Sequence, residues 1–297
     1  MTMRQLPKYV ATICCLIVTV IATTPQASAQ LAVRLELNKS SYIVNEPIKA
    51  TVYITNNAGR KITLSEKNGS PWLDFIISAL GRGLTPSRPT NYGVVVIAAG
   101  ETVARSVILN SSYALETMGN YICQVYIQMP EAGRNGFVSN RLSFNVMKGR
   151  VMWSQRVGIP GAPNEIREYE LLSFTGNRSM ELFANVTSVN RKQEIATIPL
   201  GKIISFRKPS GMLDGANNMH VIYQLAPDMF GHSCVTPSGI LQFTKFHKRG
   251  SSGNPRLTKF ANGEVVVAGS VPYDPVAEEA QRNKVRNASE RPPFIYN

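Results

Sequence analysis

The chain has 297 residues, with 32 Lys and Arg against 19 Asp and Glu and a formal net charge of +13. The positive charge is spread along the chain in short clusters, which favours an anionic envelope component or polymer as partner over nucleic acid. The sequence contains no Walker loop, H-E-x-x-H motif, EF-hand loop or G-x-S-x-G elbow in its structural context, which argues against the enzyme and metal classes that those motifs identify. We therefore expect no cofactor.

Residues 1–29 have the pattern of a secretory signal peptide. Arg4 and Lys8 precede an apolar run over residues 9–22, and Ala27-Ser28-Ala29 provides an A-x-A cleavage site. The run is shorter than the roughly twenty residues that a membrane-spanning helix needs. We therefore expect a secreted or periplasmic protein that begins at Gln30 and has no transmembrane anchor in the mature chain.

Cleavage would remove two cysteines and leave Cys123 and Cys234. An even pair in an oxidising compartment invites a disulfide. The two residues fall in different predicted domains, however, and Cys123 lies in an alternating strand pattern. A buried free thiol, which packs as a small hydrophobic group, is the preferred interpretation.

Residues 30–147 predict a β-sandwich, since short alternating segments are separated by turns and no amphipathic helix intervenes. The stretch Leu31 to Leu37 alternates strictly, and Asn56-Asn57-Ala58-Gly59 is strong turn chemistry. The expected strands cover residues 31–37, 48–55, 61–64, 72–80, 94–98, 103–109, 120–128 and 141–146, with a Gly/Pro-rich loop over residues 81–93.

The stretch from Leu37 to Asn56, with Tyr42, Glu46 and Pro47 inside it, resembles the opening of bacterial secreted immunoglobulin-like modules of the macroglobulin and proteinase-inhibitor type. The segment Ser139 to Val146 is similar to the last strands of that fold. The resemblance implies an immunoglobulin-like sandwich over residues 31–147. It implies no activity, because many functions share this fold.

A short linker at residues 147–150 leads to a second β-rich domain, residues 148–275, which ends before a flexible tail at 276–297 that could hold one or two helical turns. Its segments repeat a turn-then-strand shape that is loosely similar to propeller blades. About 125 residues are too few for a closed propeller of blades with roughly 40–45 residues each. A second sandwich and a partial propeller both remain open.

The histidines of the mature chain all lie in the second domain, and they supply its candidate metal ligands: His220, His232, Cys234 and His247. His232 and Cys234 would share a strand face two residues apart. These donors suit zinc or copper, although their spacing matches no established metal signature. The alternative is that the histidines lie at turns and edges beside a packed thiol.

A basic segment, Lys245, His247, Lys248 and Arg249, is the candidate binding surface for an anionic polymer. Alternation puts Phe243, Lys245 and His247 on one face of a strand and Phe246 and Lys248 on the other. An edge strand protected from aggregation by lysines would have the same pattern.

The sequence thus predicts an all-β protein, not an enzyme and without catalytic residues, that acts as an exported binding or structural module of the envelope or extracellular space. Its partner would be an envelope or extracellular protein or an anionic polymer. One alternative is an envelope metal-binding protein or enzyme that uses the histidines and Cys234. Another is a proteinase inhibitor, for which the loop at residues 81–93 would be the contact surface.

Export makes a direct prediction about the N-terminus. When the full chain is produced in a bacterial host, intact-mass analysis of the protein from the periplasm or medium should give a chain that begins at Gln30. The substitution Ala29→Arg should block this processing, because the cleavage site requires a small residue. A protein that stays in the cytoplasm and begins at Met1 would contradict export.

Overall fold

The computed structural model describes residues 30–284 except residues 68, 89, 130–135, 177–178 and 252. The described part is almost entirely β-structure, which confirms the all-β prediction. The predicted signal peptide, with Cys14 and Cys15, and residues 285–297 lie outside the described residues. In the described part, no helix combines the length and the apolar character needed to cross a membrane.

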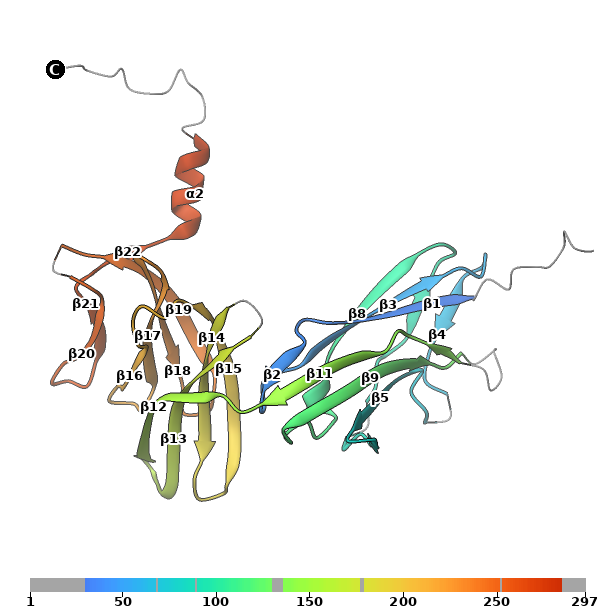
Figure 1. Ribbon diagram of the computed structural model, residues 1–297, viewed down its shortest axis with the longest axis horizontal. Coiled ribbons are helices and arrows are strands. Elements are labelled where there is room, and N and C mark those ends of the chain that lie inside the picture. The colour runs from blue at the N-terminus through green and yellow to red at the C-terminus, as the bar shows by residue number, and fades with distance from the viewer. Residues whose placement is uncertain are drawn as a thin grey trace, which may run out of the picture.

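The N-terminal half forms two sheets around one hydrophobic core (Figure 1). One sheet has the order β1-β3-β8 and the other the order β2-β11-β9-β5-β6, with β10 beside β9; β4 and β7 form a separate pair. The elements are β1 (Leu31–Leu37), β2 (Ser41–Ile43), β3 (Lys49–Asn56), β4 (Ile62–Leu64), β5 (Leu73–Ala79), β6 (Arg82–Leu84), β7 (Val95–Ile97), β8 (Thr102–Ile108), the short 3-10 helix η1 (Leu109–Ser111), β9 (Gly119–Ile127), β10 (Phe137–Val138) and β11 (Leu142–Met147).

Two segments of this half differ from the sequence prediction. The loop expected over residues 81–93 begins with strand β6, because Leu80 and Gly81 both have positive φ and close a two-residue hairpin between β5 and β6. No strand was expected over residues 41–43, but β2 forms there and pairs in parallel with β11. Only residues 148 and 149 separate β11 from the next strand.

The C-terminal half contains two consecutive antiparallel meanders, a strand order like that of propeller blades (Figure 1). The first is β12-β13-β14-β15; the second is β16-β17-β18-β19, to which β22 adds, and β20 and β21 form a hairpin. The elements are β12 (Arg150–Ile159), β13 (Ala162–Thr175), β14 (Met180–Ser188), β15 (Gln193–Ile203), β16 (Ser210–Leu213), β17 (Met219–Ala226), β18 (Met229–Val235), β19 (Leu241–Arg249), β20 (Arg256–Lys259), β21 (Val265–Ala268), β22 (Ser270–Tyr273) and α2 (Pro275–Lys284).

A second core lies between the two meanders. Tyr169, Leu182 and Val186 from the first meander and Met219, Val221 and Tyr223 from the second belong to one buried cluster. Helix α2 occupies the start of the segment expected as a flexible tail, and the Asp274 carboxylate caps it by accepting the Val276 and Ala277 backbone N–H groups.

The segment around β2 joins the two halves. Ile43 is buried in a cluster with Phe174 and Phe183 of the second half. Gly149 permits this approach, because a Cβ at that position would lie 3.0 Å from the Leu172 Cβ and 3.6 Å from the Ile43 Cδ1. The junction is therefore a packed interface and not an extended linker.

Lys39 adds a charged contact to this junction. Its ammonium group donates to the buried Glu46 carboxylate at 2.6 Å and to Glu181 of the second half. Burial alone would lower the pKa of Lys39, but the bonds to Glu181 and Glu46 raise it above its ordinary value. Asn45 also bonds to Glu194 across the junction. We call Lys39, Ile43, Asn45 and Glu46 with their partners in the second half the interdomain clamp.

The clamp predicts the effect of removing its cation. Lys39→Met should lower the free energy of unfolding by about 3 kcal/mol, since it leaves the buried Glu46 carboxylate without a counterion. Urea denaturation is the measurement. The control is Lys49→Met, which removes an exposed lysine from β3. Equal stability of the two variants would contradict the clamp.

Candidate functional site

The register of the second meander places the predicted site residues on one face of its sheet. In the ladders His220 is opposite Cys234, Cys234 is opposite Phe243, and His232 is opposite Lys245. His247 is opposite Phe230, which belongs to the same face. The intervening residues Met219, Val221 and Tyr223 face the core. All three histidines and Cys234 therefore converge on the side away from the core.

The three histidines border a cavity of about 620 Å³, which we call the histidine cavity. Asp214 and the following turn form one edge, and the β20–β21 hairpin with Glu264 covers it. The hairpin approaches through a glycine contact: the Gly215 N–H donates to the Gly263 carbonyl at 2.8 Å, and a Cβ on Gly263, where φ is +87°, would lie 3.0 Å from the Gly215 Cα. The lining side chains are Asp214, Ala216, His220, His232, Phe243, Lys245, His247, Asn262, Glu264 and Val265 to Val267.

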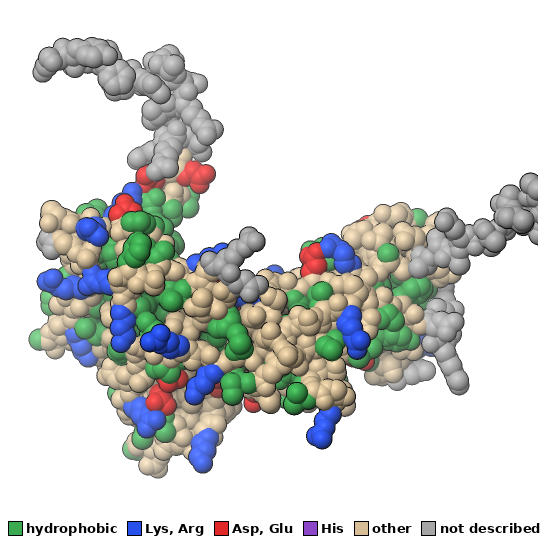
Figure 2. Space-filling model, in the orientation of Figure 1, with side chains coloured by type: hydrophobic (Ala, Val, Ile, Leu, Met, Phe, Trp, Pro, Cys, Tyr) green, Lys and Arg blue, Asp and Glu red, His purple; other side chains and the backbone are tan. Residues whose placement is uncertain are grey.

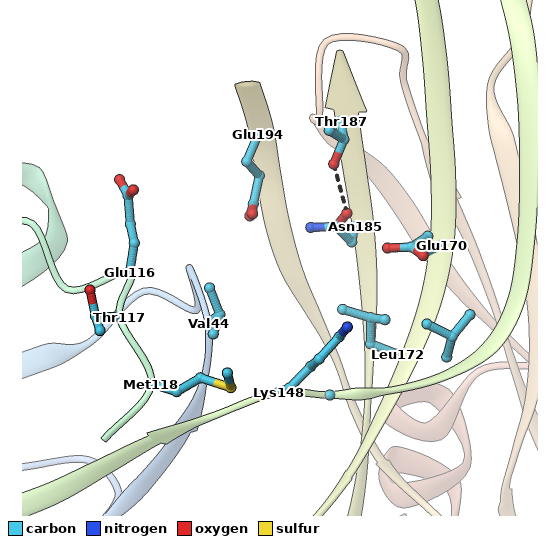
Figure 3. A pocket seen from close by; sticks show the side chains of 12 residues that line it. Val44, Glu116, Thr117, Met118, Lys148, Glu170, Leu172, Asn185, Thr187 and Glu194 are labelled. Carbon is cyan, nitrogen blue, oxygen red and sulfur yellow. Dashed lines mark hydrogen bonds between the residues drawn. The ribbon is translucent and has the colours of Figure 1, made fainter. Parts of the chain in front are cut away.

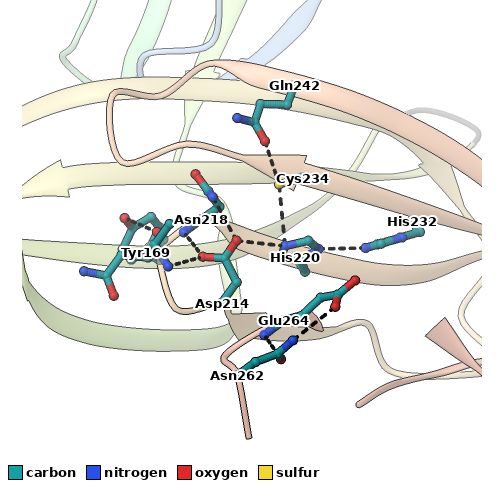
Figure 4. Close-up of polar contacts among 11 residues, drawn as sticks. Tyr169, Asp214, Asn218, His220, His232, Cys234, Gln242, Asn262 and Glu264 are labelled. Carbon is teal, nitrogen blue, oxygen red and sulfur yellow. Dashed lines mark hydrogen bonds and ion pairs between the residues drawn. The ribbon is translucent and has the colours of Figure 1, made fainter. Parts of the chain in front are cut away.

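His220 is at the centre of a polar network (Figure 4). Its Nδ1 lies 3.0 Å from the His232 Nε2, and its Nε2 lies 3.4 Å from the Asp214 Oδ2 and 3.7 Å from the Cys234 Sγ. The Cys234 thiol donates to the Gln242 Oε1 at 3.2 Å. Asp214 is held by the Ala216 and Asn218 N–H groups, so the turn that the sequence predicts here also positions a carboxylate.

His247 has a different environment. Its Nδ1 lies 3.1 Å from the Ser270 Oγ, and its ring centroid is 5.9 Å from that of His232. The Nε2 is buried and has no hydrogen-bond partner, and it is the one such side-chain atom in the described part of the chain. A buried polar atom without a partner calls for an explanation, such as a bound water or ion or a functional role.

Three ionisable groups of this site, His232, His247 and Cys234, are held in their neutral forms. Burial, reinforced by His220, His247 and Lys245, lowers the pKa of His232 to about 3. Burial and Lys245 also lower the pKa of His247. Burial and the Asp214 charge raise the pKa of Cys234 to about 11. At neutral pH the His232 and His247 imidazoles are thus unprotonated and the Cys234 thiol is protonated.

The four residues of the predicted basic segment lie in different environments. Lys245 and His247 face the histidine cavity. Lys248 is paired with Glu278 of α2 at 2.9 Å and lies over the Tyr273 ring, while Arg249 is exposed. Figure 2 shows Lys and Arg side chains spread over the second half without a dense patch. The four residues therefore do not form one surface.

Both remaining cysteines are buried and free. Among the described residues, no group of three or more His, Cys, Asp or Glu side chains is already arranged to hold a metal ion. Three of the predicted donors, His220, His232 and Cys234, meet through hydrogen bonds to one another, whereas His247 bonds to Ser270. Sequence reasoning missed the partners Gln242, Ser270 and Glu264, which come from β19, β22 and the covering hairpin.

A second cavity, of about 550 Å³, lies at the junction of the two halves (Figure 3). Glu116 approaches it from the first half, and Glu170 and Glu194 from β13 and β15. Burial raises the pKa of both Glu170 and Glu194. Val44, Met118 and Leu172 supply apolar walls.

Comparisons with known proteins give only distant structural similarity. No protein-family model matches the chain, and no curated protein matches it. Among solved structures, the sporulation control protein Spo0M from Bacillus subtilis is similar with a TM-score of 0.27 and 11% identity, over 58% of this chain and 91% of that one. The YadV chaperone is similar with a TM-score of 0.21 and 9% identity, over 80% of this chain and 99% of that one. Similarities at this level assign neither a family nor a function.

The lowered pKa of His232 predicts that the free energy of unfolding decreases in acid. The unfolded chain binds a proton near pH 6.5 and the folded chain only near pH 3, so the contribution of His232 to stability is complete above pH 6.5 and falls as the pH drops through this window. Between pH 7 and pH 5, wild type should lose about 2 kcal/mol more stability than His232→Gln, which does not titrate there. Urea denaturation in EDTA at both pH values tests this, and equal losses would refute it.

Proposed function

We propose that this chain is an exported, non-catalytic binding protein whose recognition site is the histidine cavity. Its place would be the periplasm or the extracellular space. The first half would be an immunoglobulin-like sandwich, which fits two sheets around one core. The second half would carry the ligand site, and the partner would be an envelope or extracellular molecule.

The observation that carries this proposal is the unpartnered nitrogen of His247. The residue is 9% exposed, its Nε2 has no hydrogen bond, and its side chain borders a cavity of about 620 Å³. An unsatisfied buried polar atom costs about 1–3 kcal/mol. A ligand that hydrogen-bonds to this nitrogen would recover that free energy, and the recovery would contribute to its affinity for the cavity.

The protonation of the site favours binding over catalysis. A cysteine nucleophile acts as a thiolate, whereas the pKa of Cys234 is raised to about 11. A general base works best with a pKa near the working pH, whereas that of His232 is lowered to about 3. Neither residue is poised for acid–base or nucleophilic chemistry at neutral pH.

The chemistry of the cavity also narrows the kind of ligand. Lys245 could attract an anionic group, and the overall positive charge would draw anions to the surface. Asp214 and Glu264 bring negative charge to the opposite edge. A ligand with both polar donors and acceptors suits this mixture better than a uniformly anionic polymer.

Substitution of His247 tests the proposal without knowledge of the ligand. His247→Phe keeps an aromatic ring but removes the unsatisfied nitrogen, so it should stabilise the unliganded protein by about 1 kcal/mol in urea denaturation. The same change should abolish a non-covalent adduct that native mass spectrometry finds on protein isolated from its natural host. His247→Gln, whose amide can occupy the position of Nε2, is the matched control and should keep part of the adduct.

Two results would contradict the proposal. One is wild-type protein that carries no adduct and is more stable than His247→Phe. The other is an adduct that His247→Phe retains as fully as wild type does.

A further inference from the structure

We propose that Asp214, His220 and Cys234 form a Zn²⁺ site at the inner edge of the histidine cavity, with His232 as the positioning residue for His220. This inference rests on the proposed binding role of the cavity, and it identifies a metal ion as one component of what the cavity binds. It assigns a role to the polar network beneath the hairpin, which the His247 argument does not use.

The distances within the network carry the proposal. The His220 Nε2 lies 3.4 Å from the Asp214 Oδ2 and 3.7 Å from the Cys234 Sγ. The contact to Asp214 is long for a hydrogen bond. In a tetrahedral zinc site, with Zn–N near 2.05 Å, Zn–O near 2.1 Å and Zn–S near 2.3 Å, the N···O and N···S edges are about 3.4 and 3.6 Å. One nitrogen of His220 thus stands at ligand spacing from two further donors.

The other nitrogen of His220 is arranged as in a metal site. Metal-binding histidines usually donate their second ring N–H to an acceptor that fixes the tautomer and the ring orientation. The His220 Nδ1 lies 3.0 Å from the His232 Nε2, and both residues are buried. With His232 as acceptor, the lone pair of His220 is on Nε2, toward Asp214 and Cys234.

Charge balance favours a divalent ion here. Binding of Zn²⁺ would displace the thiol proton of Cys234 to solvent and form a Zn–S bond. The thiolate and the Asp214 carboxylate then carry two negative charges against the two positive charges of the ion. The site would be neutral, which suits its burial. The mixed N, O and S donors also fit zinc better than calcium or magnesium, which prefer oxygen alone.

The unliganded molecule requires one local rearrangement before it can bind. Among the described residues, no three donors are yet arranged around one point, because Cys234 donates to Gln242 at 3.2 Å. Asp214 is already oriented by Asn218 and Ala216. Asp214 and His220 both border the cavity, so a fourth position on the ion would be reached from it.

The test is a titration of the processed protein, reduced and stripped of metal, first with Co²⁺ and then with Zn²⁺. Wild type should bind one Co²⁺ per chain with a thiolate-to-cobalt charge-transfer band in the near ultraviolet, and one Zn²⁺ should remove the band. Cys234→Ser should lose the band and weaken Zn²⁺ binding by roughly 100-fold or more, since the loss of a residue that only orients a metal ligand already costs about 10–100-fold. Cys123→Ser is the matched control, because Cys123 is a buried free cysteine in the first half, and it should behave as wild type.

Two further variants keep the test decisive if Cys234→Ser does not fold. Asp214→Asn should weaken Zn²⁺ binding while the sulfur band persists at high Co²⁺, and His232→Gln should weaken it by about tenfold. Wild type without stoichiometric binding, a Co²⁺ complex without the sulfur band, or full affinity in Cys234→Ser would each overturn the zinc site. None of these results would change the adduct test on His247, so failure of the metal site is distinct from failure of the cavity as a binding site.

Discussion

The alternation of side chains along β17, β18 and β19 is the constraint on which the candidate site depends. Met219, Val221 and Tyr223 are buried in the core between the two meanders, and this fixes which face of the sheet turns inward. A shift of one residue would bring His220 into that core and turn its apolar neighbours toward the polar face. The hydrophobic face therefore determines, through the strand register, that the histidines and Cys234 meet on the opposite face.

Much of this could be predicted from the sequence, and the limits have physical causes. Period-two patterns located most strands of the first half, and they placed His232 with Cys234 and Lys245 with His247 on shared faces. They could not show that His220 lies opposite Cys234, because ladder register depends on pairing between separate segments. Strand β2 escaped prediction because three residues give too short a pattern, and the covering hairpin contributes Glu264 through tertiary packing alone.

The two halves of the protein use burial for different purposes. In the first half, the buried Cys123 packs within the core as an ordinary apolar side chain. In the second half, the face of β17 and β18 that turns away from the core is buried as well, but it is covered by a hairpin and holds polar groups. Desolvation by burial keeps the His232 and His247 imidazoles unprotonated and the Cys234 thiol protonated. Burial removes these polar groups from water and so makes them poor acids and bases. A bound ligand that hydrogen-bonds to them would replace the lost contacts with water.

The interdomain clamp has a consequence for how the molecule meets larger partners. Lys39 and Ile43 fix the second half against the first. The connecting chain at Gly149 is itself packed against Leu172 and Ile43, so the halves are not joined by a flexible spacer. Two surfaces held at a constant angle have already lost their relative rotational freedom during folding. A partner that spans both halves would therefore associate with less entropic cost than it would with two tethered modules, because the composite surface is preorganised.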